Sequence, residues 1–301
     1  MPELPEVETV RAGLEKHVVG KKIISVKQLH PRALRAESLN KLTIFKGAKV
    51  KAVKRRGKFM WLEFDRPEVL VAHLGMSGQF KIQSTNSERE PHLRAFFELS
   101  NGKEMRFVDQ RTFGWLSVDE IVDGVPRIVS HIAIDLFDPD FNKKAVVKKI
   151  ATKRGQIKKV ILDQEVLSGI GNIYADEALW YSKIHPERIA SNLSEVEIRS
   201  ILKSVKKVMK RALDAGGTTF DDLYINVNGE SGYFDISLRA YGQDGRSCRR
   251  CGAVIRRIAF ANRSSHFCPR CQIWPRKVAG RGSRKNVNKN VGKKARKTGA
   301  K

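Results

Sequence analysis

Four cysteines near the C-terminal end of the chain have the spacing of ligands to one metal ion. Two residues separate Cys248 from Cys251, sixteen residues follow, and Cys268 and Cys271 repeat the first spacing. Two such knuckles joined by a hairpin are typical of structural zinc sites, in which four thiolates close the tetrahedron and leave no position for water or substrate. The alternative is a pair of disulfides, but nothing in the sequence indicates secretion. We therefore predict one structural Zn²⁺.

The segment between the two cysteine pairs, residues 252–263, has a strand-and-turn pattern with arginines at the turn. It carries Arg256, Arg257 and Arg263. A hairpin fixed by a metal and presenting guanidinium groups suits contact with a phosphate backbone. The alternative is that these arginines are only solvated surface charges.

The N-terminus is a second place where chemistry is available. If Met1 is removed, Pro2 becomes a secondary amine, and an α-amino group with a pKa of roughly 7.7–8.0 is partly unprotonated near neutral pH. Such an amine attacks acetal or carbonyl-like carbons and forms an iminium, which is an electron sink for later elimination. Glu3 is placed to transfer a proton, and Glu6 to orient the amine. The alternative is ordinary helix capping by a proline and first-turn acids.

The elements that position these groups divide into two halves. An apolar stripe predicts a helix up to residue 18, ended by Gly20 in a left-handed conformation. From residue 21 to about 118, short runs rich in Val, Ile and Phe predict an antiparallel sheet domain. The strands we expect are 23–29, 50–53, 59–64, 69–74 and a hairpin of 95–99 with 104–108, turned at Asn101-Gly102.

Beyond about residue 130 the apolar period lengthens to that of helices. We expect helices at 142–152, 157–162 and 174–182. The strongest helix follows Ser194, which forms a capping box with Glu197, and is predicted to end at Gly216 and Gly217. The fold class is therefore α+β.

The charge of the chain points to a polyanionic partner. The sequence has 58 Lys and Arg against 32 Asp and Glu, a net charge of +26, and 41% of its residues are hydrophobic, enough for buried cores. Eleven basic residues and no acid lie in 276–301, so residues 1–275 still carry +15. No apolar run approaches the roughly 20 residues of a membrane-spanning helix. We expect a cytoplasmic protein that binds nucleic acid, since nucleic acid is the usual partner of so basic a chain.

Several motifs occur in the order found in one family of DNA repair enzymes. The chain opens with Met1 to Val10 as MPELPEVETV, and continues with RRGK at 55–58, HLGMSG at 73–78, DQRTFG at 109–114, GIGNIYA at 169–175 and GGTT at 216–219, before the cysteines. Over residues 2–272 the sequence resembles the formamidopyrimidine-DNA glycosylases of bacterial base-excision repair. The resemblance implies an N-terminal β-sandwich, a helix-two-turn-helix domain and a four-cysteine zinc-finger hairpin.

The resemblance also implies a mechanism. Pro2 attacks the anomeric carbon of a damaged nucleotide, Glu3 acts as acid and base on the sugar ring, and the base departs. Lys58 is assigned to proton transfer in base release and β-elimination, and Arg263 to the second (δ) elimination. We favour phosphate binding as the main task of Arg263, because a guanidinium of very high pKa is a poor proton donor.

DNA contacts are implied in the same way. Met76, Arg111 and Phe113 match residues that fill the gap left by an extruded nucleotide. An arginine facing cytosine implies an oxidised purine as the lost base, such as 8-oxoguanine or a formamidopyrimidine. The positions that match phosphate contacts are His73, His92, Arg154, Asn172 and Tyr241. We expect a monomer that acts on double-stranded damaged DNA and not at a membrane.

The resemblance suggests a division into five parts and leaves some points open. The parts are a catalytic domain (1–130), the helix-two-turn-helix domain (131–217), a lesion-capping loop and linker (218–245), the zinc finger (246–275) and a disordered basic tail (276–301). The chain departs from the family pattern at Thr112, where a second basic residue is common, and in its tail. The tail fits a solvated end, extra DNA affinity or a nuclear-type signal.

Three other functions share some of these sequence features, and each is disfavoured by others. An endonuclease VIII-type enzyme prefers oxidised pyrimidines, but Leu4, Met76, Arg111 and Phe113 favour the purine enzyme. A zinc protein that binds DNA without catalysis is disfavoured by Pro2, Glu3 and Lys58. A tautomerase with a terminal proline has no use for a zinc finger or for so basic a body.

Overall fold

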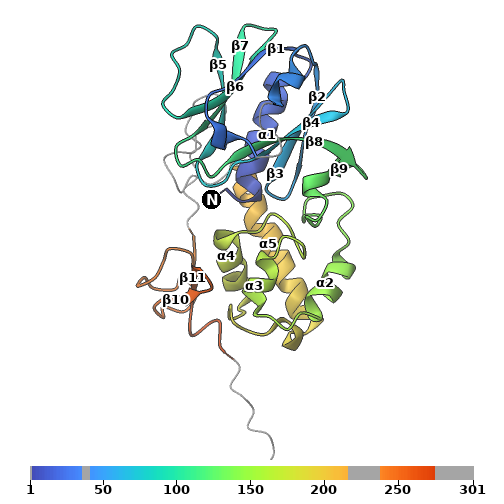
Figure 1. The fold of residues 1–301 in the computed structure, drawn as a ribbon. Coiled ribbons are helices and arrows are strands. Elements are labelled where there is room, and N and C mark those ends of the chain that lie inside the picture. Colours follow the sequence, from blue (N-terminus) through green and yellow to red (C-terminus); the bar gives the residue numbers. More distant parts are fainter. Residues whose placement is uncertain (1, 36–40, 216–237, 275–301) are drawn as a thin grey trace, which may run out of the picture.

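The computed structural model describes residues 2–35, 41–215 and 238–274 (Figure 1). Several expectations therefore lie outside the described residues: the loss of Met1, the glycines after the long helix, most of the capping loop and the tail 276–301.

The N-terminal half is a sandwich of two antiparallel sheets with one helix. Helix α1 (Leu4–Val18) comes first, and Gly20 has the predicted left-handed φ of +80°, one residue after the extended C-cap Val19. One sheet has the order β1-β6-β7-β5 and the other the order β2-β3-β4-β8-β9. The strands are β1 (Ile23–Gln28), β2 (Val50–Arg56), β3 (Phe59–Phe64), β4 (Glu68–His73), β5 (Gly78–Ser84), β6 (Leu93–Leu99), β7 (Lys103–Asp109), β8 (Trp115–Val122) and β9 (Val125–Pro126). All the predicted strands and the 95–108 hairpin are confirmed.

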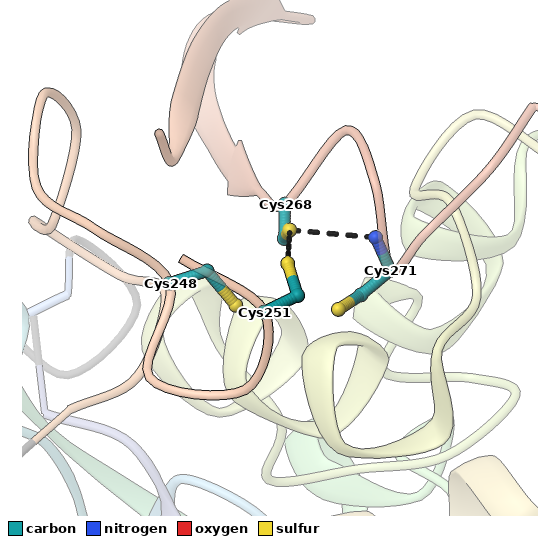
Figure 2. A group of neighbouring side chains, drawn as sticks. All are labelled: Cys248, Cys251, Cys268 and Cys271. Carbon is teal, nitrogen blue, oxygen red and sulfur yellow. Dashed lines mark hydrogen bonds between the residues drawn. The ribbon is translucent and has the colours of Figure 1, made fainter. Parts of the chain in front are cut away.

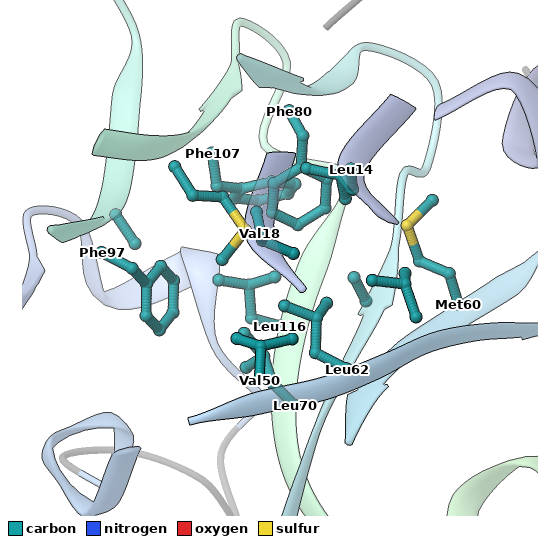
Figure 3. Close-up of a cluster of buried hydrophobic side chains, with 14 of the residues drawn as sticks. Leu14, Val18, Val50, Met60, Leu62, Leu70, Phe80, Phe97, Phe107 and Leu116 are labelled. Atoms are coloured by element: carbon teal, nitrogen blue, oxygen red, sulfur yellow. The ribbon is translucent and has the colours of Figure 1, made fainter. Parts of the chain in front are cut away.

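The core of this half lies between the inner faces of the sheets and the apolar stripe of α1 (Figure 3). Leu14 and Val18 of the helix pack with Leu62, Leu70 and residues of the opposite sheet. The described residues of this half also include three short 3₁₀ segments, Pro31–Ala33, Leu42–Phe45 and Arg127–Val129, which contact strands β1 and β8. Short runs rich in Val, Ile and Phe predicted this half, and they form largely buried strands such as β4 and β7.

The C-terminal half is built from four helices around a second core. They are α2 (Lys143–Ala151), α3 (Ile157–Leu162), α4 (Asn172–Ser182) and α5 (Glu195–Asp214), with a 3₁₀ turn at Ala190–Asn192. The predicted capping box is present, since the Ser194 hydroxyl accepts the Glu197 N–H and Glu197 accepts the Ser194 N–H. Of the described helices, none has the length and apolarity needed to cross a membrane.

The cysteine hairpin packs beside α4 as strands β10 (Arg256–Phe260) and β11 (Arg263–Phe267) (Figure 1). Its turn is at Ala261 and Asn262, so Arg263 follows the turn directly. The placement of Arg256 and Arg257 at the turn was wrong: they begin β10 at the far end of the hairpin. The reason is that residues 252–255 belong to the first cysteine knuckle, where the Cys248 N–H binds the Ala253 carbonyl.

The two halves meet at the start of α1. The Leu4 N–H donates to the Gly169 carbonyl at 3.0 Å, and the Leu4 side chain belongs to the helical core and not to that of the sandwich. On the linker, buried Asp135 accepts from Arg55 at 2.8 Å. The N-terminal residues are therefore held by the second half of the chain.

Candidate active site and zinc centre

Glu3 is the side chain that the fold constrains most tightly. It is 2% exposed and points at the N-terminus of α4. Its carboxylate accepts N–H bonds from Gly171 at 2.6 Å and from Ile173 at 2.9 Å. Pro2, directly before it, is buried as well. The N–H groups of Gly171 and Ile173 at the start of α4 are therefore taken by a carboxylate of the chain itself.

The pKa of Glu3 is raised to about 7. Burial is the largest cause, the Lys58 ammonium opposes it, and the neighbouring Glu6 carboxylate adds to it. The backbone N–H bonds also favour the anion, but they do not outweigh the loss of water. Glu3 can therefore exist with or without its proton near neutral pH, which a general acid and base needs.

Glu6 completes the support around the N-terminus. One carboxylate oxygen accepts the Glu3 N–H at 2.8 Å, and the other accepts the Tyr174 hydroxyl at 2.8 Å. Its predicted role was to orient the Pro2 amine, and the described contacts place it between α1 and α4. The sequence gives no sign of this contact of the Tyr174 hydroxyl, because 168 residues separate Tyr174 from Glu6.

Lys58 is buried in the same environment. It is 7% exposed, and burial lowers its pKa to about 8, with Glu3 raising the value and Arg263 lowering it. It lies in the turn between β2 and β3, where Gly57 has a φ of +57°. The Arg55 guanidinium donates to the Gly57 carbonyl at 2.9 Å and to Asp135, which fixes this turn to the linker. Lysine with a lowered pKa can donate and accept a proton near neutral pH.

Arg263 is exposed, and a buried network behind it fixes its hairpin. Lys158 and Asp176 are both fully buried and form an ion pair at 2.6 Å. Lys158 donates to the Ser264 carbonyl at 2.9 Å, and Asp176 accepts the His266 N–H at 2.9 Å. Sequence reasoning missed this network, because its members are far apart in the chain and each is an ordinary residue for its own helix or strand.

Met76, Arg111 and Phe113 lie on two loops whose backbones touch. All three are exposed, with Phe113 52% and Met76 36% accessible, and the Arg111 guanidinium lies 5.1 Å from the Phe113 ring centroid. Met76 lies on a glycine-rich loop between Gly75 and Gly78. A Cβ on Gly75 would come within 2.3 Å of the Phe113 backbone, so only glycine allows this approach.

Asp109 holds the second of these loops and was not assigned a role from sequence. Its buried carboxylate accepts the Gly114 N–H at 2.7 Å, the Arg111 N–H at 3.2 Å and the Ser77 hydroxyl. The first aspartate of the 109–114 motif therefore orders the residues that follow it and ties them to the Met76 loop.

The predicted phosphate contacts lie in several elements. His73 is half-buried, with a pKa lowered to about 4 by burial and then by Lys58 and Arg35, so it is neutral at pH 7. Its Nδ1 accepts the Gly75 N–H at 3.1 Å, which leaves Nε2 as the protonated nitrogen.

The other contacts differ in exposure. His92 is exposed, with a φ of +67°, and Arg154 is exposed before α3. Asn172 begins α4, and its buried Oδ1 has no hydrogen-bond partner among the described residues. The Tyr241 ring packs edge-on against the His266 ring, with 5.1 Å between the two ring centroids.

The four cysteine sulfurs gather at one point (Figure 2). They lie within 4.8 Å of one another, and Cys248 and Cys268 are buried while Cys251 and Cys271 are half-buried. Thiolates at Zn–S bonds of about 2.3 Å are the preferred donors of a structural zinc, so this donor set fits the ion. The indole N–H of Trp180 donates to the Cys248 sulfur at 3.4 Å, a contact that spacing did not predict.

Comparison with known proteins agrees with this geometry. Family models match the N-terminal domain of formamidopyrimidine-DNA glycosylase at residues 1–116, its H2TH domain at 132–223, and a zinc finger found in FPG and IleRS at 245–273. The chain is 52% identical to a formamidopyrimidine-DNA glycosylase of Corynebacterium glutamicum and to one of Mycobacterium avium. These matches cover 90% and 92% of this chain and 99% and 100% of the relatives.

Solved structures of the Lactococcus lactis enzyme are also similar. A mutant bound to DNA containing Fapy-dG superposes with a TM-score of 0.83 at 33% identity, covering 91% of this chain and 100% of that one. A complex with abasic-site DNA gives 0.82 at 33% identity, covering 90% and 100%. A third holds DNA with an oxidised pyrimidine, with a TM-score of 0.82 at 33% identity, covering 91% and 100%. With its three domains matched in order and half its residues identical to curated members, the chain belongs to the formamidopyrimidine-DNA glycosylase family.

Proposed function

We propose that this base-excision repair glycosylase and AP lyase removes oxidised purines, 8-oxoguanine and formamidopyrimidines, through a covalent iminium on Pro2. The observation that carries the proposal is the placement of Glu3. Its carboxylate is buried beside Pro2, held by α4, and titrates near pH 7 next to a lysine whose pKa is about 8. Two proton-transfer groups with pKa values moved towards neutrality, beside a terminal amine, suit acid-base catalysis on a sugar.

The proposed reaction starts when the Pro2 nitrogen forms a bond to the anomeric carbon. The glycosidic bond breaks, the base leaves with that electron pair, and the proton that the Pro2 nitrogen gives up balances the proton that the base takes up. Glu3 gives a proton to the ring oxygen, the ring opens, and a C=N⁺ iminium remains. Loss of a proton from the adjacent carbon then breaks the 3′ carbon–oxygen bond, and a second elimination breaks the 5′ bond. Each phosphate leaves with the electrons of the bond that broke.

Lys58 and Arg263 are the cations proposed for the elimination steps. The lowered pKa of Lys58 supports a role in moving protons during base release and β-elimination. Arg263 is exposed at the hairpin tip and lowers the pKa of Lys58, so the two cations act on the same region. We propose that Arg263 binds the phosphate that leaves in the δ-elimination, a role its planar guanidinium performs without losing a proton.

We propose that the loops that carry Met76, Arg111 and Phe113 recognise the damaged site, and that residues of both halves of the chain bind the phosphates. Met76 and Phe113 enter the gap left by the extruded nucleotide, and Arg111 donates to the orphaned cytosine. His73, His92, Arg154, Asn172 and Tyr241 contact phosphates. The described feature that supports the His73 contact is its neutral ring, whose Nε2–H can donate to a phosphate oxygen.

The zinc and the domain boundaries complete the proposal. Cys248, Cys251, Cys268 and Cys271 would hold one Zn²⁺, which supplies rigidity to the hairpin that carries Arg263. The division at 130/131 is supported by the separate cores of sandwich and helices, and that at 245/246 by the cysteine cluster that packs on Trp180.

Covalent trapping with borohydride tests the mechanism. Wild-type protein on a duplex with 8-oxoguanine opposite cytosine is expected to give a trapped protein–DNA adduct, and Pro2→Gly to give far less, because a primary amine on a flexible residue replaces the ring-held secondary amine. Glu3→Gln should bind the duplex but release base at least about 100-fold more slowly, since general acid-base groups contribute 10²–10⁴-fold. Base release by Glu3→Gln at the wild-type rate would remove Glu3 from the mechanism.

A second duplex separates the alternatives in substrate. Thymine glycol in the same sequence should be cut more slowly than 8-oxoguanine, and faster cleavage would assign the chain to the pyrimidine-preferring type. Absence of an adduct with both duplexes and with abasic DNA would leave a binding protein without catalysis.

A further inference from the structure

A groove on the helical half is not used by the proposed reaction. It lies between α5 and the linker before α2 and has a volume of about 430 Å³, within the range of ligand-binding clefts. In Figure 1, α2 lies on one side of α5 and the β10–β11 hairpin on the other. We call it the lysine groove; its lining residues are Leu136, Phe141, Lys143, Leu202, Lys203, Lys206, Lys207 and Lys210.

The rim of the lysine groove is unusually uniform in charge. Four of its lysines follow the spacing i, i+3, i+4, i+7 along α5, so they share one face of the helix. All are exposed, and the lining contains no acid. Among the described residues, only Lys210 of the five has an ion pair, with Asp214 at 3.0 Å. Like charges at this spacing repel one another, so an anionic ligand would relieve a cost already present in the helix.

The floor of the groove is apolar. Leu136 and Leu202 are 4% and 1% exposed and Phe141 is half-buried, all within or against the helical core. An apolar floor ringed by ammonium groups matches a ligand with both apolar side chains and carboxylates.

These features distinguish a peptide from a nucleic acid. Grooves for single strands offer aromatic faces on which bases stack. Here the Lys206 ammonium lies 5.7 Å from the Phe137 ring centroid, and that of Lys207 lies 5.1 Å from the Tyr181 ring centroid, so each of these rings already has a cation beside it. Phe141 is the one aromatic residue of the lining, and a single ring does not make a stacking platform for successive bases. Phosphate sites also favour the planar fork of arginine, and the lining has none.

We propose that the lysine groove docks an acidic peptide segment of a partner protein, with one or two apolar side chains on the floor and carboxylates on the lysines. The groove is lined by residues of the linker, α2 and α5 that have no part in the proposed reaction. This goes beyond the glycosylase activity and does not depend on it.

Fluorescence polarisation of a labelled peptide, Asp-Asp-Glu-Leu-Phe-Asp-Glu, against the full chain tests the proposal. Saturable binding is expected. Lys203→Glu with Lys206→Glu should weaken it about tenfold or more, because two ion pairs are lost and two repulsive charges take their place. Lys27→Glu with Lys51→Glu makes the same charge change on exposed sites of the sandwich and should alter binding less than about twofold.

Two further measurements fix the class of ligand. Replacing Leu and Phe of the peptide by Ala should also weaken binding about tenfold or more, since both side chains would lose their burial on the apolar floor. A lesion duplex should leave the peptide bound. The proposal fails if no saturable binding occurs, if both lysine pairs act equally, or if a single-stranded octanucleotide or the duplex displaces the peptide from the groove.

Discussion

Glu3 combines two opposed influences on one carboxylate. Burial raises its pKa, while the α4 N–H groups and Lys58 favour the anion, and the balance lies near 7. The folded chain therefore binds the Glu3 proton more tightly than an unfolded chain does. Stability contributed by this group is greatest below its ordinary pKa of 4.5 and is lost as the pH rises towards 7.

Glu3→Gln should therefore stabilise the fold while removing activity. At pH 8 the wild type holds a buried anion that glutamine does not carry, so we expect a gain of about 1–3 kcal/mol in the free energy of unfolding. At pH 5 the folded Glu3 is protonated, and the gain should be smaller. Urea unfolding at both pH values measures it. Asp140→Asn, at an exposed site, should show no such pH dependence; an equal effect of Glu3→Gln at pH 5 and 8 would show that burial does not control this carboxyl.

Trp180 is a second residue whose contact has a consequence of its own. Its indole N–H donates to Cys248, and its ring is covered by the Arg250 guanidinium at 3.9 Å. Hydrogen bonds to thiolates reduce their charge and orient them on the metal.

Trp180→Phe keeps the ring and removes the N–H, so zinc should be held less tightly. Loss of such an outer contact typically costs 10–100-fold in metal affinity, and we expect about tenfold. Zinc release to a chromogenic chelator measures it. Trp61→Phe, which removes an indole bond to Glu63 in the sandwich, is the control. Equal zinc release by both variants would mean that the Cys248 contact has no effect.

At the scale of elements, the N-terminal end of helix α4, capped by Gly171, binds the Glu3 carboxylate. A Cβ there would lie 2.3 Å from the Glu3 carboxyl carbon, although the backbone of Gly171 has an ordinary φ of −124°. The glycine is thus required by the close approach of two elements and not by its own conformation.

Gly171→Ala should expel the Glu3 carboxylate and leave α4 intact. We expect base release to fall about 100-fold, the contribution of a positioned acid or base. Single-turnover kinetics on 8-oxoguanine duplex measure this fall, and affinity for an uncleavable duplex should change little. Gly155→Ala is the matched control, because its Cβ would meet only Val160 at 3.5 Å. Wild-type base release by Gly171→Ala would contradict the requirement.

At the scale of the whole molecule, sequence reasoning succeeded where the signal is local. Strands, helices, the Ser194 capping box and the cysteine spacing are patterns within a few residues. It failed where residues far apart share one carboxylate, as Glu3 does with α4 and Asp176 with Lys158 and His266. Such contacts depend on how the halves pack, and no periodicity encodes them. The prediction that placed Arg256 and Arg257 at the hairpin turn was wrong for a related reason. Residues 252–255 have a strand-like sequence but belong to the first cysteine knuckle, so the strand begins later.

The charge of the molecule also divides at this scale. Residues 1–275, the body of the molecule, carry +15 and include the proposed phosphate contacts. Residues 276–301 add eleven basic residues. If the body neutralises ~6 phosphates, the logarithm of its DNA affinity should fall with the logarithm of salt at a slope of about −5 to −6.

Without residues 276–301, the salt dependence should become less steep, with a slope of about −5 to −6. A stretch of eleven cations without an acid is attracted to any duplex, so the full chain is expected to have a steeper slope. Because such binding carries no sequence information, the deletion should weaken binding to lesion and undamaged duplexes by the same factor. Titrations from 50 to 200 mM salt on both duplexes measure the two slopes. Identical slopes with and without the tail would make it a solvated end, and a loss confined to the lesion duplex would place it in recognition of damage.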